Sequence, residues 1–157
     1  MRSGVRVGVD VGKVRIGVSR SDLHGMLATP VETVARSEDG ADRLRIAGIV
    51  TELGAFEVIV GLPLALSGAH TASTGDAIGF ARSLAIELDA TVDVRLVDER
   101  LSTVSAHSAL RSAGKNSKSA RPVVDQVAAT IILQHALDTE RAVGRPPGTL
   151  VEPNIGT

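Results

Sequence analysis

Apolar residues recur with two different periods along this chain, and the order of those periods limits the folds open to it. Residues 5–11 and 15–20 alternate apolar with polar or small residues, the period of strands with one buried face, and Gly12 to Val14 predict a hairpin turn between them. Farther along, compact apolar runs alternate with stretches of helical spacing. A meander followed by alternating strands and helices predicts a three-layer α/β domain with a mixed sheet of five strands.

The boundaries of the predicted elements follow from acidic residues, glycines and prolines beside the apolar runs. We expect strands at 5–11, 15–20, 31–34, 56–60 and 92–97, and helices at 38–53, 74–88, 102–113 and 122–142. The polar segment 114–120 predicts a mobile loop. The domain would then cover residues 1–143, and residues 144–157 would form a C-terminal tail.

Composition excludes several classes of site and of location. The chain has no cysteine, which rules out disulfides, cysteine zinc sites and thiol catalysis, and favours a reducing cytosolic compartment. Its only aromatic residues are two phenylalanines, so it lacks the base-stacking platforms of many RNA-binding modules. No apolar stretch approaches the roughly 18 residues of a membrane span. We expect a soluble, cytoplasmic protein without a membrane partner.

Familiar motifs for phosphate, metal and nucleotide are missing. Residues 8–14 look like a phosphate-binding loop but have one residue too few between the glycines and no Ser or Thr after Lys13. The four histidines fall on different predicted elements without metal-ligand spacing. An actin-like phosphotransferase that used Asp10 and Gly12 would need two lobes around ATP, and the chain has room for one domain.

Three carboxylates mark the ends of predicted elements. Asp10 ends the first strand, Glu99 follows the last strand, and Asp125 lies in the first turn of the last helix. Because ligands of α/β sheets bind at strand ends, these acids can converge there, and oxygen ligands suit Mg²⁺ or Mn²⁺. Structural roles stay open for Asp125, as an acid at a helix N-terminus, and for Glu99, in a solvated charge cluster. Asp10 interrupts a strand of valines, where a buried carboxylate is costly, so a functional role is favoured there.

Basic residues gather in two segments. Residues 1–20 contain five basic residues and one acid, and residues 111–121 contain four basic residues and no acid. Since the net charge of the whole chain is −1, any attraction to phosphate must come from such local groups. The second segment leads directly to Asp125, which favours a phosphate-binding role over a merely solvated loop.

Four blocks of the sequence, in the same order, resemble the YqgF family of bacterial proteins. The blocks are Gly8–Val18, Val60–Pro63 with Gly68, Asp98–Thr103, and Asp125–Ala129 with Ile132–Gln134. The similarity runs from Val5 to about Asp138 and leaves out the segment after Gly144. The resemblance is weaker in the loop at residues 64–68, which has apolar residues where many members of the family are expected to carry Asn and Asp.

The resemblance implies an RNase H-like fold and a metal-dependent nuclease. The family is described either as processing precursor small-subunit ribosomal RNA or as resolving Holliday junctions. Its acidic triad falls on Asp10, Glu99 and Asp125, which would bind Mg²⁺ or Mn²⁺. Arg15 is carried over as a substrate-contacting position.

We therefore predict a hydrolase that cuts phosphodiester bonds with two metal ions, Asp10 bridging them, and that processes the 5′ end of precursor ribosomal RNA. The residues expected to hold the strand by its phosphates are Arg15, Lys115, Lys118 and Arg121. One alternative is a Holliday junction resolvase acting on four-way DNA, which would require a twofold homodimer. Another is a catalytically silent adaptor for nucleic acid or a transcription complex.

Overall fold

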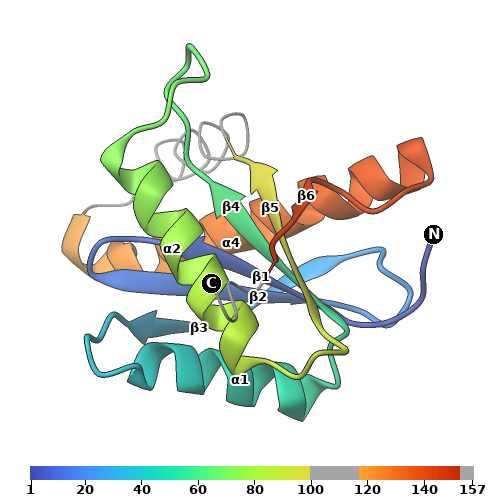
Figure 1. The fold of residues 1–157 in the computed structure, drawn as a ribbon, viewed down its shortest axis with the longest axis horizontal. Helices are drawn as coiled ribbons and strands as arrows, with labels where there is room; N and C mark the ends of the chain where they lie inside the picture. Colours follow the sequence, from blue (N-terminus) through green and yellow to red (C-terminus); the bar gives the residue numbers. More distant parts are fainter. Residues whose placement is uncertain (100–116, 153–157) are drawn as a thin grey trace.

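The computed structural model describes residues 1–99 and 117–152, with the side chains of 117–123 left out. Within these ranges one mixed sheet is covered by helices on both faces (Figure 1). The strands are β1 (Arg6–Val11), β2 (Arg15–Ser21), β3 (Ala28–Ala35), β4 (Glu57–Leu62), β5 (Asp93–Asp98) and β6 (Thr149–Leu150), and the helices are α1 (Ala41–Leu53), α2 (Ala72–Glu87) and α4 (Ser117–Val143).

The strands lie in the order β3-β2-β1-β4-β5-β6. The first three form an antiparallel meander, and β1, β4 and β5 run parallel at the centre. This arrangement confirms the predicted α/β fold with a mixed sheet. The sheet has six strands instead of the expected five, because β6 pairs antiparallel with β5.

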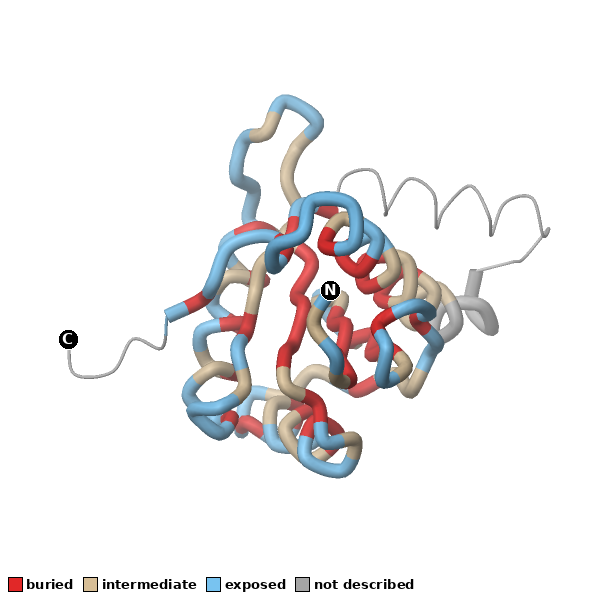
Figure 2. The backbone as a smooth tube through the Cα atoms, turned by 90° about the vertical axis from the view of Figure 1, so that its right-hand side faces the viewer, coloured by how far each residue is buried: buried red, intermediate tan, exposed pale blue. Residues whose placement is uncertain are grey.

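The two faces of the sheet are covered differently. Helices α1 and α2 pack on one face, where Val7 and Val9 of β1 meet apolar residues of both helices. Helix α4 packs on the other face, where Ile59 of β4 and Val97 of β5 meet Ile132. The central strands are buried along most of their length (Figure 2). Because successive side chains of a strand point to opposite faces, Gly8 and Asp10 lie on the α4 face.

Small residues on the sheet let α4 approach closely. A Cβ at Gly8 would lie 2.8 Å from Cβ of Leu133 and 3.0 Å from the carbonyl oxygen of Ala129. A Cβ at Gly17 would overlap the backbone of Asp125. The hydroxyl of Ser19 donates a hydrogen bond of 2.8 Å to the carbonyl of Ala129. Helix α4 is therefore held at a fixed height above β1 and β2.

Helix α4 begins earlier than expected. The sequence predicts a loop over 114–120 and a helix opened by Pro122, but α4 starts at Ser117. Residues 117–121 contain no glycine or proline, and a proline so near the amino end of a helix removes only one backbone hydrogen bond. The end of α4 at Val143, before Gly144, agrees with the prediction. The helix expected at 102–113 lies outside the described residues.

Most other boundaries shift by one or two residues, and α1 begins at Ala41, after Gly40, rather than at residue 38. Three further differences have a physical reason. Strand β3 begins at Ala28 and includes Pro30, which an edge strand tolerates. Helix α2 begins at Ala72, because Thr71 caps it through reciprocal hydrogen bonds with Thr74. The expected tail contributes β6, and Val151 beyond it is buried. In the described ranges, every helix is too short or too polar to cross a bilayer.

Candidate active site

Asp10 lies near the carboxyl end of β1 between two strands that both carry glycine at its level. It pairs with Gly17 of β2, and because Val9 pairs with Val60, it lies level with Gly61 of β4. Residues at one level of neighbouring strands point to the same face, so all three positions face α4. The two glycines leave open the space on either side of the Asp10 carboxylate.

Asp125 reaches this space from helix α4. Its backbone carbonyl lies over Gly17, so closely that a Cβ there would overlap it. Since Gly17 is the pairing partner of Asp10, this contact brings Asp125 beside Asp10 although the two are far apart in sequence. The two carboxylates are close enough for the negative charge of Asp125 to raise the pKa of Asp10.

Glu99 enters the same region from the opposite side. It directly follows β5, and its backbone N–H donates a hydrogen bond of 3.3 Å to the carbonyl of Leu62 at the end of β4. Glu99 is 7% exposed, and its carboxylate lies over Gly61, where a Cβ would overlap Oε2. The structure thus places carboxylates on both sides of Asp10 at the carboxyl ends of the parallel strands.

The electrostatics of the site disfavour charge on Asp10. Burial, together with the neighbouring negative charge of Asp125, raises the pKa of Asp10 from 3.8 to about 6. One positive group lies nearby, because Nε of Arg15 is 3.0 Å from Oδ2 of Asp125. Arg15 is two residues from Gly17 on β2 and therefore lies on the same face.

These residues suit a divalent cation in donor type and in charge. Carboxylate oxygens are the preferred ligands of Mg²⁺ and Mn²⁺, and a cation between Asp10 and Asp125 would relieve the repulsion that raises the pKa of Asp10. As they stand, however, no three Asp, Glu or His side chains in the described ranges are grouped closely enough to hold one ion. The fit therefore rests on the pair Asp10 and Asp125. Glu99 follows β5, and its carboxylate lies over Gly61 of the intervening strand β4.

Sequence reasoning missed Arg36, which fixes the turn that follows Asp10. From the end of β3, its Nη1 donates to the carbonyl of Gly12 at 2.8 Å. The same guanidinium binds both carboxylate oxygens of Asp76 on α2, at 2.8 and 3.0 Å, and lies 5.5 Å from the ring centroid of Phe80. Nothing local in the sequence signals this contact, since Gly12, Arg36 and Asp76 belong to three separate elements.

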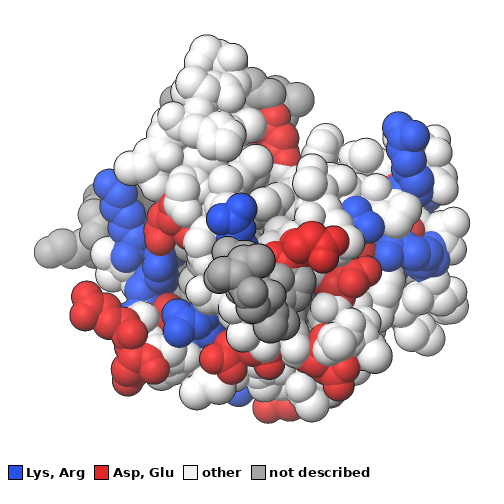
Figure 3. Space-filling view, viewed as in Figure 1, with Lys and Arg blue, Asp and Glu red and all other residues white. Residues whose placement is uncertain are grey.

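The basic residues of segment 1–20 do not form one phosphate-binding surface. Arg2 and Arg6 lie at the amino ends of the parallel strands, where Arg2 binds Glu57 at 2.9 Å and Arg6 binds Glu140 at 3.1 Å. Arg6 is 1% exposed and therefore unable to contact a ligand. On the face shown in Figure 3, basic and acidic side chains are interspersed.

The second basic segment falls largely outside what the structure describes. Arg111 and Lys115 lie outside the described residues. Lys118 and Arg121 belong to helix α4 by their backbone, but their side chains are not described. Of the positions predicted to hold phosphates, Arg15 is therefore the one whose side chain the structure places, and it lies at the carboxylates.

The connection between β4 and α2 projects beyond the carboxyl end of β4 (Figure 1). Leu64 and His70 form a bridge across it, and the N–H of Gly68 donates a hydrogen bond of 2.7 Å to the carbonyl of Ala65. Leu66 near its tip is 85% exposed. This projection therefore exposes an apolar side chain near its tip.

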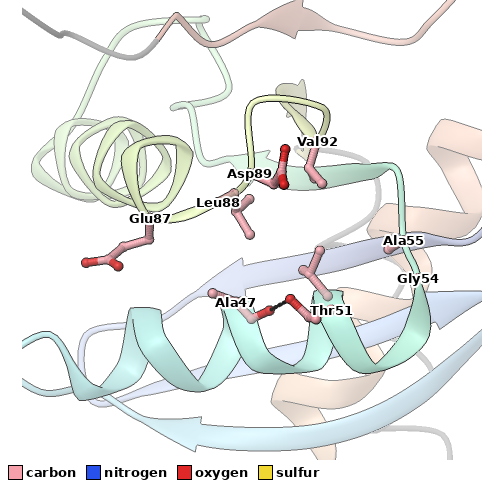
Figure 4. Close-up of a pocket in the computed structure, with 9 residues that line it drawn as sticks. Ala47, Thr51, Gly54, Ala55, Glu87, Leu88, Asp89 and Val92 are labelled. Atoms are coloured by element: carbon pink, nitrogen blue, oxygen red, sulfur yellow. Dashed lines mark hydrogen bonds between the residues drawn. The ribbon is translucent and has the colours of Figure 1, made fainter.

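A pocket of about 250 Å³ lies away from these residues, between the end of α1 and the α2–β5 connection (Figure 4). Thr51, Leu88 and Val92 are among the residues that line it. It lies on the α1 and α2 side and at the amino ends of β4 and β5, whereas the carboxylates lie on the α4 side at the carboxyl ends. The pocket therefore takes no part in the candidate site.

Comparison with protein families gives a match over most of the chain. A family model described as "RuvX: Holliday junction resolvase" matches residues 4–139. A protein of Leifsonia xyli subsp. xyli is 76% identical over 156 residues, which cover 99% of each chain. A protein of Clavibacter michiganensis subsp. michiganensis is 64% identical over 98% of this chain and 95% of its own. Both relatives carry the provisional name of pre-16S rRNA nuclease.

Solved structures are similar in fold. The RuvC protein of Thermus thermophilus, in complex with a Holliday junction substrate, matches with a TM-score of 0.58 and 20% identity over 91% of this chain and 99% of its own. Another structure of RuvC from the same organism matches with a TM-score of 0.54. At this identity the likeness concerns the fold alone, and it confirms the expected α/β architecture with a mixed sheet, the arrangement that RuvC also has.

Proposed function

The chain belongs to the RuvX family, for which YqgF is another name, and we propose on this basis that it is a metal-dependent nuclease that hydrolyses phosphodiester bonds. The observation that supports the proposal is the approach of Asp125 and Glu99 to Asp10 from two sides. Two glycines, Gly17 and Gly61, make that approach sterically possible. Carboxylates at the carboxyl ends of parallel strands lie where ligands of such sheets bind, and there they can hold metal ions that assist hydrolysis.

The roles of the residues follow from their positions. Asp10, Glu99 and Asp125 would hold Mg²⁺ or Mn²⁺, which when bound activates water and stabilises the leaving oxygen. Asp10 itself is negatively charged only above its pKa of about 6, so below that pH protons compete with the cation for this carboxylate. Arg15, on the same face, is positioned to bind a phosphate of the strand being cut.

The substrate we propose is precursor 16S ribosomal RNA, cut to form its 5′ end. The names of the relatives at 76% and 64% identity support this choice. With two phenylalanines as the only aromatic residues, and Phe56 and Phe80 both next to arginines, contacts to RNA would be made to the backbone and its shape rather than to stacked bases. Such an enzyme would work in the cytoplasm, where the RNA is made.

A second candidate is the resolution of Holliday junctions. It is supported by the description of the family and by the fold of RuvC, whose complex contains a junction. Symmetric cutting of two strands requires two active sites related by a twofold axis, whereas trimming of RNA does not. Sedimentation at micromolar concentration bears on this choice, because a monomer would count against symmetric resolution and would leave the trimming of RNA unaffected.

The test is a gel cleavage assay with Mg²⁺ and Mn²⁺, in which precursor RNA with a 5′ extension and a four-way DNA junction are offered in parallel. We expect product from the wild type and none from Asp10→Asn. Asp138→Asn is a matched control, because Asp138 is an exposed residue of α4 that pairs with Arg141. Equal cleavage by wild type and Asp10→Asn would refute the assignment, and binding without metal or product would favour the adaptor.

A further inference from the structure

Arg15 forms an ion pair in the middle of the candidate site. Its Nε lies 3.0 Å from Oδ2 of Asp125, a residue 110 positions later in the chain. The side chains are 32% and 21% exposed, so the pair is neither a solvated surface contact nor fully buried. The ion pair has to break before the Asp125 carboxylate can bind another cation or the Arg15 guanidinium can bind another anion.

The pair occupies Oδ2 of Asp125, one of the carboxylate oxygens that would coordinate the proposed metal ion. The backbone of Asp125 packs over Gly17, the pairing partner of Asp10, and the Arg15 guanidinium supplies positive charge to the Asp125 carboxylate at this place. A carboxylate oxygen that accepts a hydrogen bond from a guanidinium has less lone-pair capacity left to coordinate a cation. Guanidinium and divalent cation therefore compete for the same group.

We propose that Arg15 is an internal counter-ion of the carboxylate site. It neutralises Asp125 when no metal is bound, competes with the incoming cation, and is released by metal binding to contact the phosphate of the substrate. The metal ion and the phosphate in this proposal rest on the proposed function. The competition for Asp125 rests on the observed ion pair.

The structure allows the side chain of Arg15 to move while its backbone stays in place. The carbonyl of Arg15 accepts a hydrogen bond of 2.9 Å from the N–H of Gly12, which closes the β1–β2 turn. Arg15 also pairs with Ala35 of β3. Release of the guanidinium therefore requires side-chain rotation alone and leaves Asp10, on the neighbouring strand, undisturbed.

The test measures Mn²⁺ binding to the metal-free full-length protein by electron paramagnetic resonance, which detects the free ion. Arg15→Gln removes the competitor, so we expect its Kd for Mn²⁺ to fall about two- to five-fold, the range expected for breaking a partly exposed ion pair. Arg15→Lys should lie between Arg15→Gln and the wild type. Lys13→Gln is the control, because it removes an equal charge from an exposed position of the same turn.

Two outcomes of the Mn²⁺ measurement would overturn the proposal. An unchanged or weaker Mn²⁺ affinity in Arg15→Gln would mean that the ion pair only ties β2 to α4. An equal gain in Lys13→Gln would mean that the effect is long-range charge rather than competition for Asp125.

A second measurement follows the released guanidinium. With Ca²⁺ in place of Mg²⁺, Arg15→Gln should bind an RNA strand several-fold more weakly than the wild type, with a smaller dependence on salt. Unchanged RNA affinity would refute the phosphate contact. If the Mn²⁺ affinities shift as expected but no substrate is ever cut, the counter-ion role stands and the nuclease assignment fails. If neither wild type nor Arg15→Gln binds Mn²⁺, both fail.

Discussion

Replacing Gly17 by alanine adds one methyl group at the point where helix α4 rests on strand β2. That methyl would overlap the carbonyl of Asp125 and lie 3.0 Å from the backbone N of Gln126. Because the atoms it meets belong to the backbone, no side-chain rotation relieves the clash, and the helix has to move away from the sheet.

The size of the effect follows from this geometry. Inserting a methyl group into a packed region costs about 1–3 kcal/mol, and a contact with backbone belongs at the upper end. For a domain of this length, about 3 kcal/mol lowers Tm by roughly 6–12 °C. Since Asp125 moves with the helix, the site also opens, and a displacement of about 1 Å can reduce turnover by roughly 100-fold.

The assay is urea denaturation of the metal-free wild type and of Gly17→Ala. Binding of Mn²⁺ to folded Gly17→Ala is then measured without urea. Gly48→Ala is the control, because Gly48 lies in α1 and a Cβ there meets nothing within 4 Å. The control should raise stability by up to about 1 kcal/mol, as glycine is a poor helix former. The reasoning is refuted if Gly17→Ala unfolds within about 0.5 kcal/mol of the wild type, the range of an ordinary surface substitution.

Three further predictions concern charge. In metal-free protein the pKa of Asp10 is raised from 3.8 to about 6, so the folded state binds this proton more tightly and the contribution of Asp10 to stability falls as pH rises from about 4 to 6. Asp10→Asn should therefore melt above the wild type at pH 7, and the difference between the two should vanish near pH 4. Equal melting of the two proteins at every pH would contradict this. Glu140→Ala should cost about 3 kcal/mol in urea denaturation, because Arg6, 1% exposed, then loses its carboxylate partner. Glu32→Gln, which breaks an exposed pair with Arg45, should cost less than about 1 kcal/mol.

Local sequence signals predicted the elements well where a glycine or a change of period marked the boundary. Gly12 begins the turn between β1 and β2, and Gly54 ends α1 in the left-handed conformation that favours glycine. The ends that were mispredicted depend on distant partners. Strand β6 exists because it pairs with β5, and no local pattern in two residues carries that information.

The candidate site was partly within reach of sequence reasoning. Asp10 and Glu99 could be placed at strand ends from periodicity, and the orientation of parallel strands then put both at one edge of the sheet. The small residues that admit Asp125 could not be identified, because glycine in a strand has several explanations. The same limit applies to Arg2 and Arg6, whose carboxylate partners are remote in sequence.

The burial of β1 and β2 beneath α4 has a consequence for the timing of activity during synthesis. A ribosome completes all the strands from β1 to β5 before it adds Asp125 and the rest of α4. Until α4 has emerged and docked on Gly8 and Gly17, the nascent chain has Asp10 but lacks the carboxylate that approaches it over Gly17. If Asp10 and Asp125 hold the metal ion as proposed, an unfinished chain lacks one of the two ligands, and cleavage would begin only after α4 has docked on the sheet.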